Sequence, residues 1–179
     1  MTRLCPPPEN FMLASMFNKR FYLKYLEYFD ISVYIVCAVD DQAVIDQILA
    51  TAGLQSVFNA VYTNPASFDS SGCLQLSPYH RQDWCRLSQP NLCKGHILDE
   101  HCRTSGIKYD VIAFVGDGEN DFCPTLRLRE TDVVFPRRNY RLEKRIARDR
   151  EKVAAVVRPW DTGVDIMNAL KDALRNTSA

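Results

Sequence analysis

The sequence has no excess of charge of either sign and no long apolar run. Lysine and arginine total 22, aspartate and glutamate also total 22, and the formal net charge is zero. This balance argues against the strongly basic surface that nucleic acids or anionic membranes attract. No hydrophobic stretch approaches the ~20 residues that a membrane-spanning helix needs. The composition therefore predicts neither a nucleic-acid partner nor a membrane partner.

Regularly spaced cysteines are also missing. The seven cysteines are an odd number, and no two of them form a Cys-x₂-Cys pair. A zinc site could still be drawn from six loosely spaced side chains, namely His80, Cys85, Cys93, His96, His101 and Cys102. We interpret the cysteines instead as reduced thiols, which favours a cytoplasmic setting. A zinc-binding interaction module stays as an alternative.

Apolar runs that alternate with helical patterns predict the fold class. A chain of 179 residues is long enough for one domain with a sizeable core. Strands are predicted at residues 32–38, 57–63, 111–115, 132–135 and 153–157, and helices at 18–28, 41–52, 91–104, after Asn120, 140–152 and 164–174. Residues 64–92 are rich in proline, serine and glycine and are predicted to be irregular. This alternation is typical of a parallel α/β sheet flanked by helices.

The stretch KYDVIAFVGDGENDFCP, residues 108–124, organises the rest of the chain. Residues 111–115 are apolar without alternation, as expected of a strand that is covered on both faces. Gly116 and Gly118 then permit a sharp turn, and Asp117, Glu119 and Asp121 gather carboxylates in it. Ligands of parallel α/β sheets bind at this carboxyl end of the strands. The pattern therefore predicts a site in this loop.

The acidic loop has two other interpretations, a solvated turn and a calcium loop. An isolated Asp-Gly is usually a solvated turn, but this motif is longer. A calcium loop of the helix-loop-helix kind would need glycine where Phe122 stands and glutamate where Leu128 stands, so that interpretation fails. A hard-cation site suited to Mg²⁺ and phosphate oxygens remains.

A lysine upstream of the loop completes the chemical signal. Lys94 follows Asn91-Leu92-Cys93 at the start of a predicted helix. Such a lysine is usually only exposed, but phosphate chemistry needs a fixed cation to offset negative charge. The basic run at residues 138–152 has mixed signs and is interpreted as a solvated helix face.

These motifs together resemble the phosphoethanolamine/phosphocholine phosphatase and pyridoxal phosphate phosphatase family, a branch of the haloacid-dehalogenase-like hydrolases. The resemblance runs from about residue 46 to residue 174 and rests on five segments: Thr63-Asn64-Pro65, Tyr79-His80, Asn91 to Lys94, Gly116 to Pro124 and Gly163 to Ile166. It implies a Rossmann-like three-layer parallel sheet of the haloacid-dehalogenase type.

The same resemblance implies roles for individual residues. Lys94 is similar to the family's catalytic lysine, and Asp117 and Asp121 are similar to its Mg²⁺-binding acids. Gly118 and Asn120 fall in the phosphate pocket. The implied partner is a small phosphorylated metabolite.

The sequence departs from the family at its amino-terminal end. The family's first strand ends in Asp-x-Asp-x-Thr, whose first aspartate is the nucleophile, yet no Asp-x-Asp occurs in this sequence. Ala38 and Val39 stand where the second motif should carry serine and aspartate, and nearby Asp40 and Asp41 are not assumed to replace them. We therefore predict a divergent segment at residues 1–30 and a core domain at 31–179 that lacks its first, central strand and the cap. Exposed strand edges would then favour self-association, unless residues 11–17 supply a surrogate strand.

Three functional hypotheses follow. The first is a Mg²⁺-dependent phosphatase of small phosphomonoesters, with this chain an incomplete or inactive form of the enzyme. The second is a non-catalytic relative that keeps the phosphate and Mg²⁺ pocket and acts as a binding protein. The third is the zinc-binding module.

Overall fold

A computed structural model describes residues 11–15 and 31–176 of the chain. The helix predicted at residues 18–28 lies outside the described residues. Among the helices that are described, none combines the length and the apolar composition needed to cross a bilayer.

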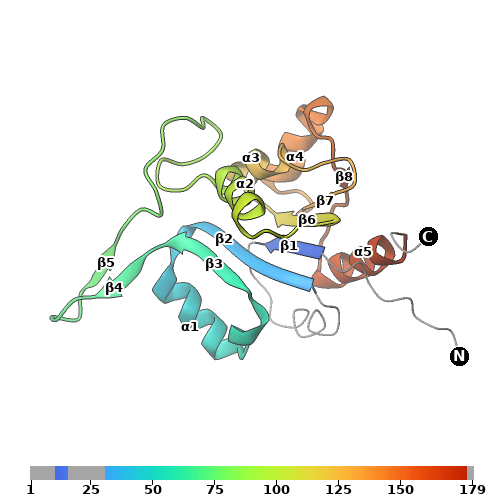
Figure 1. Cartoon of the computed structure of the whole chain (residues 1–179). Helices are drawn as coiled ribbons and strands as arrows, with labels where there is room; N and C mark the ends of the chain where they lie inside the picture. The colour runs from blue at the N-terminus through green and yellow to red at the C-terminus, as the bar shows by residue number, and fades with distance from the viewer. Residues whose placement is uncertain (1–10, 16–30, 177–179) are drawn as a thin grey trace, which may run out of the picture.

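One parallel sheet forms the centre of the molecule (Figure 1). Its strand order is β3-β2-β1-β6-β7-β8, and every neighbouring pair runs parallel. The strands are β1 (Phe11–Ser15), β2 (Ile31–Asp41), β3 (Ala60–Asn64), β6 (Val111–Gly116), β7 (Val133–Pro136) and β8 (Val156–Val157). The sheet contains all five predicted strands, so the α/β class with a parallel sheet is confirmed.

β1 occupies the central position that the sequence was expected to leave empty. Residues 11–15 pair with residues 31–35 of β2 on one side and with residues 111–115 of β6 on the other. The expectation of a missing central strand is therefore wrong for this sheet, because a strand with a different sequence stands there. Neither β2 nor β6 has an unpaired inner edge, which removes the reason given for self-association.

Helices cover both faces of the sheet (Figure 1). α1 (Gln42–Ala52) and α5 (Gly163–Asn176) pack on one face through Ile45, Leu49 and Leu170. α2 (Lys94–Thr104), α3 (Phe122–Thr125) and α4 (Arg141–Arg148) lie on the other face. The strand residues alternate between the two cores, which gives a three-layer α/β/α arrangement.

The ends of α1 follow from local chemistry. Asp41 accepts a hydrogen bond from the Val44 backbone N–H at 3.1 Å, which satisfies one of the free donors of the first turn. Gly53 closes the helix in the left-handed conformation with φ of 64°. The predicted helix at 41–52 is confirmed.

Three short 3₁₀ turns account for most of the boundary differences. η2 (Gln55–Val57) delays the start of β3, η3 (Glu119–Asp121) precedes a four-residue α3, and η4 (Arg150–Lys152) ends the predicted helix at 140–152 early. β8 has only two residues, shorter than the predicted strand at 153–157.

A hairpin projects from the body between β3 and α2 (Figure 1). β4 (Ala66–Phe68) and β5 (Leu74–Leu76) pair antiparallel, where the sequence predicted irregular chain. Hydrogen bonds to the Asp69 carboxylate hold its turn, those of Ser71 foremost, and lower the pKa of Asp69 to about 2. Phe68 and Leu76 remain 66% and 60% exposed, so burial does not define this hairpin. The serine-rich turn led to the prediction of irregular chain.

Candidate functional site

Lys94 and Asp121 meet at the carboxyl end of the sheet. Lys94 is the first residue of α2, and Asp121 ends the η3 turn after β6. The Lys94 Nζ donates to Asp121 Oδ1 over 2.6 Å, and the two side chains are 1% and 0% exposed. A buried charged group needs such a partner, because moving the group out of water without a partner costs several kcal/mol.

The second oxygen of Asp121 shapes the loop. Asp121 Oδ2 accepts hydrogen bonds from the backbone N–H groups of Asp117 at 3.0 Å and Gly118 at 2.9 Å. The Thr125 hydroxyl donates to the Asp121 carbonyl at 2.7 Å. Both carboxylate oxygens therefore already have protein donors, and Asp121 fixes Lys94 and the loop relative to one another.

Glycine is required where the loop passes closest to Asp121. A Cβ on Gly116 would lie 2.7–2.8 Å from the Asp121 side chain, and one on Gly118 would lie 2.6 Å from Asn120 Oδ1. No side chain is accommodated at such distances without movement. The two glycines noted in the sequence thus permit this close packing, while neither has the positive φ that would make glycine necessary for the turn itself.

Asp117 has a different environment from Asp121. It is only partly buried, and within the described part of the chain its carboxylate has no hydrogen-bond or ion-pair partner. Its backbone carbonyl accepts from the Leu142 N–H at 3.0 Å, which ties the loop to α4. Asp117 therefore presents a carboxylate beside the buried pair, and carboxylate oxygens are the ligands that Mg²⁺ prefers.

The structure brings together all of the site residues predicted from the sequence. Gly118, Asn120 and Asp121 lie in one turn with Asp117, and Lys94 reaches the same turn from α2. The buried Lys94–Asp121 pair therefore lies at the same turn as the partly buried Asp117.

A second hydrogen-bond network closes the end of β2, and sequence reasoning did not anticipate it. The Asn64 and Asn91 side chains both donate to the Ala38 carbonyl, at 3.2 and 3.0 Å, and Asn91 also donates to Asn64 Oδ1 at 3.0 Å. Thr63 Oγ1 donates to the Asp40 carbonyl at 2.6 Å. Two of the motifs quoted for the family resemblance therefore meet at this point. Polar residues that follow neighbouring strands were the available signal.

Asp40 and Asp41 have contacts of their own. Asp41 caps α1, and Asp40 Oδ2 accepts from the Cys37 thiol at 3.5 Å. Within the described residues, neither carboxylate contacts Lys94, Asp117 or Asp121.

A basic hollow of about 310 Å³ adjoins the loop. Its lining is Glu119, Arg141, Lys144, Arg145 and Arg148. Arg145 Nη1 donates to Glu119 Oε1 at 2.7 Å, which links α4 to η3. The basic run is mostly exposed, as predicted for a solvated face, and Arg145 in addition contacts the loop. A larger cavity of about 470 Å³ lies at the opposite, amino end of β6, and no predicted site residue lines it.

The zinc set drawn from the sequence is dispersed. The two ring nitrogens of His101 contact the hydroxyls of Tyr62 and Tyr109, at 2.8 and 2.9 Å. His80 and His96 pack their rings against Trp84. Cys85 and Cys93 approach a common point, and there they meet Cys123, which the predicted set omitted.

The sequence profile of a family described as Putative Phosphatase matches residues 17–174. The chain belongs to this family. Its relatives include the pyridoxal phosphate phosphatase PHOSPHO2 of Mus musculus, at 36% identity over 76% of this chain and 59% of the relative. A thiamine phosphate phosphatase-like protein of Arabidopsis thaliana is 40% identical over 68% of this chain and 52% of the relative. A phosphoethanolamine/phosphocholine phosphatase of Gallus gallus is 34% identical over 71% of this chain and 50% of the relative.

The family assignment confirms the resemblance inferred from the motifs. The chain spans between half and three-fifths of the length of these curated relatives.

Proposed function

We propose that this chain carries the phosphate-stabilising part of a Mg²⁺-dependent phosphatase site for small phosphomonoesters. The observation that supports it most directly is the buried Lys94–Asp121 pair at one turn with Asp117, whose carboxylate has no partner among the described residues. The substrates are the phosphomonoesters that the relatives' names give: pyridoxal phosphate, phosphoethanolamine, phosphocholine and, in addition, thiamine phosphate.

Each residue has a distinct role in this proposal. Lys94 places a fixed positive charge against the transferring phosphoryl group, and Asp121 holds that lysine in position. Asp117 would hold the cation directly, while Asp121, whose oxygens already accept from protein donors, would hold waters bound to it. Bound Mg²⁺ would neutralise charge on the phosphate oxygens. Gly118 and Asn120 line the phosphate pocket.

The fit of Mg²⁺ to these residues rests on the donor set. Asp117 and Asp121 offer oxygen ligands only, as a hard cation requires. The basic side chains of α4 beside Glu119 would draw an anionic substrate towards the loop.

Attack on phosphorus is the part of the reaction for which the sequence offers no residue. The family's nucleophile is a carboxylate in Asp-x-Asp, and the strand FMLAS stands at the central position of the sheet instead. We therefore propose that these 179 residues alone are a catalytically incomplete or inactive form. We propose a cytoplasmic location for the chain, because its cysteines are interpreted as reduced thiols.

Phosphate release tests the proposal. The chain as given is assayed with the four phosphomonoesters, with and without Mg²⁺, and we expect no release above background. A graft then replaces residues 11–17 with a family-type strand ending in Asp-x-Asp-x-Thr, with the family cap after it and with Ala38→Ser. The structure dictates replacement and not addition, since β1 already fills the space between β2 and β6.

The expected result is Mg²⁺-dependent release by the graft that Lys94→Ala and Asp117→Asn each abolish. Robust release by the unmodified chain that disappears with Asp40→Asn or Asp41→Asn would overturn the proposal, because another acid would then be the nucleophile. A folded graft that neither binds Mg²⁺ nor releases phosphate would also overturn it.

A further inference from the structure

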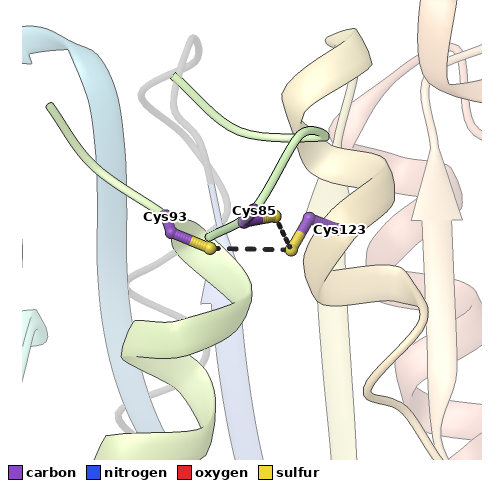
Figure 2. A group of neighbouring side chains, drawn as sticks. All are labelled: Cys85, Cys93 and Cys123. Carbon is purple, nitrogen blue, oxygen red and sulfur yellow. Dashed lines mark hydrogen bonds between the residues drawn. The ribbon is translucent and has the colours of Figure 1, made fainter. Parts of the chain in front are cut away.

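Three thiols that are distant in sequence converge beside the candidate site (Figure 2). Cys123 Sγ lies 3.4 Å from Cys85 Sγ and 3.7 Å from Cys93 Sγ, and all three sulfurs lie within 4.8 Å of one another. Cys93 and Cys123 are 1% and 2% exposed, and Cys85 is half-buried. Cys85 comes from the loop before α2, Cys93 is the residue that immediately precedes α2, and Cys123 lies in α3.

The sulfur spacing suits a metal ion better than a disulfide. A zinc–sulfur bond of about 2.3 Å in tetrahedral geometry places neighbouring sulfurs about 3.8 Å apart. A disulfide needs about 2.05 Å and would use only two of the three cysteines. The separations of 3.4 and 3.7 Å are close to the tetrahedral edge.

A buried amide holds the loop that carries Cys85. Gln82 is 7% exposed, and its Nε2 donates to the carbonyls of Cys85, Ser88 and Gln89 at 3.2, 3.3 and 2.8 Å. Its Oε1 accepts from the Cys85 N–H at 2.8 Å. One side chain thus fixes the backbone on both sides of the thiol, and this fixing is the preorganisation that a binding site requires.

The other two thiols are also held by their surroundings. Cys93 is the residue that precedes α2, where the positive end of the helix dipole favours negative charge, and its N–H donates to His80 Nε2 at 2.8 Å. α2 and α3 touch at Cys123, since a Cβ on Gly95 would lie 2.6 Å from the Cys123 sulfur.

A fourth position is available next to the thiols. Ser88 Oγ lies 3.3 Å from Cys93 Sγ and 3.5 Å from Cys85 Sγ. The Ser88 hydroxyl, or a water in its place, completes a four-coordinate set of three sulfurs and one oxygen.

We propose that Cys85, Cys93 and Cys123 bind one thiophilic cation, with Zn²⁺ as the probe, at a site separate from the Mg²⁺ site. Soft thiolate ligands select such cations over Mg²⁺. Binding of Zn²⁺ releases the three thiol protons and leaves three zinc–sulfur bonds with a net charge of −1. The bound ion joins the Cys85 loop, α2 and α3, so it braces the neighbouring Lys94 and Asp121 without contacting them.

Zinc stoichiometry tests the site. The full chain is reduced, loaded with Zn²⁺ and separated from free metal by gel filtration, and we expect one zinc per chain. Cys85→Ser, at the most exposed of the three thiols, should lower the zinc affinity at least about tenfold. Cys73→Ser, at an exposed cysteine on the hairpin, is the matched control and should bind as the unmodified chain does.

Cobalt gives a second measurement that reports the ligands directly. Co²⁺ bound by thiolates shows a charge-transfer absorption, which should appear at one equivalent and be lost in Cys85→Ser, Cys93→Ser and Cys123→Ser. Asp117→Asn should retain it, which separates this site from the proposed Mg²⁺ site. Circular dichroism confirms that each variant is folded, and Cys85→Ser keeps the test valid if either buried substitution unfolds the chain.

Several outcomes would overturn the inference. Absence of zinc from the reduced chain, or equal zinc in Cys85→Ser, would exclude the three-thiol site. Loss of zinc in Cys73→Ser or Asp117→Asn would place the metal elsewhere. A disulfide among the three cysteines, seen by non-reducing peptide mapping in a chain that takes no metal after reduction, would make the cluster a redox pair instead.

Discussion

Lys94 Nζ lies 2.6 Å from Asp121 Oδ1, and neither side chain is more than 1% exposed. The pair joins the start of α2 to the loop after β6, so one contact connects two motifs that stand 27 residues apart in the sequence. Because the same pair neutralises a buried charge and positions Lys94 in the candidate site, a change to either residue should affect stability and site chemistry together.

Removal of one partner of the pair should be costly. Lys94→Met leaves the Asp121 carboxylate buried without its cation, and we expect the free energy of unfolding to fall by about 3–5 kcal/mol. The double variant Lys94→Met/Asp121→Asn should lose less than the sum of the single losses, because no charge is then left unpaired. Urea unfolding of the four proteins measures this coupling. Additive losses would show that the pair does not interact as the structure places it.

Asp117→Asn should abolish Mg²⁺ binding with little effect on stability. The Asp117 carboxylate has no partner among the described residues, so its neutralisation removes a ligand and breaks no contact. Isothermal titration calorimetry measures the Mg²⁺ affinity. Asp110→Asn is the matched control, since Asp110 is exposed at the opposite end of β6. Equal affinity in the two variants would contradict the assignment of the loop as the metal site.

Gly116→Ala should strain the loop. The added Cβ would lie 2.7 Å from Asp121 Cγ, and hydrogen bonds with Lys94 and Gly118 hold the Asp121 side chain in place. We expect a loss of about 1–3 kcal/mol of stability from overpacking. Mg²⁺ affinity should fall as well, because Asp121 must shift. An unchanged thermal midpoint would mean that the loop is looser than its hydrogen bonds indicate.

The stability of the chain should decrease at acid pH through His101. Burial lowers the pKa of His101, whose ring lies between two tyrosine hydroxyls. The unfolded chain therefore binds the proton more readily, and stability that is fully present above about pH 6.5 is lost as the pH falls below it.

His101→Gln should flatten this dependence relative to the unmodified chain. Urea midpoints at neutral and mildly acid pH provide the measurement. His96→Gln, at a histidine that is half-exposed on the same helix, is the control and should keep the unmodified slope. The same slope in His101→Gln would place the titrating group elsewhere.

The sequence predicted those parts of the fold that local pattern and burial specify together. Residues 111–115 are fully buried in β6, and α1 begins at Asp41 and ends at Gly53 as its end residues indicate. The hairpin at 66–76 was missed because Phe68 and Leu76 are exposed, so apolar periodicity carries no burial signal there. β1 was anticipated only as an alternative, a surrogate strand at residues 11–17, because five residues after a proline-rich segment give no period to recognise.

The candidate site, too, could be predicted from the sequence only in part. Lys94, Asp117 and Asp121 belong to motifs in which residue type and position relative to a strand indicate the chemistry that we propose. The thiol cluster could not be predicted, because Cys123 stands 30 residues after Cys93 and only the packing of α3 against α2 brings them together. The hydrogen bonds from Asn64 and Asn91 to the Ala38 carbonyl likewise depend on strand order, which a single sequence does not specify.

The position of β1 has a consequence for the order of folding. Phe11 pairs with Ile31 on one side, but its partner on the other side is Val111, about a hundred residues further along the chain. Contacts of such long range form slowly, because the intervening chain must lose entropy before they contribute. During synthesis, β1 can pair with β2 early, yet β6 and the loop that follows it dock only after residues 111–121 have emerged. The candidate site is therefore assembled only after the strands that precede β6 in the sequence, β1, β2 and β3, have been made.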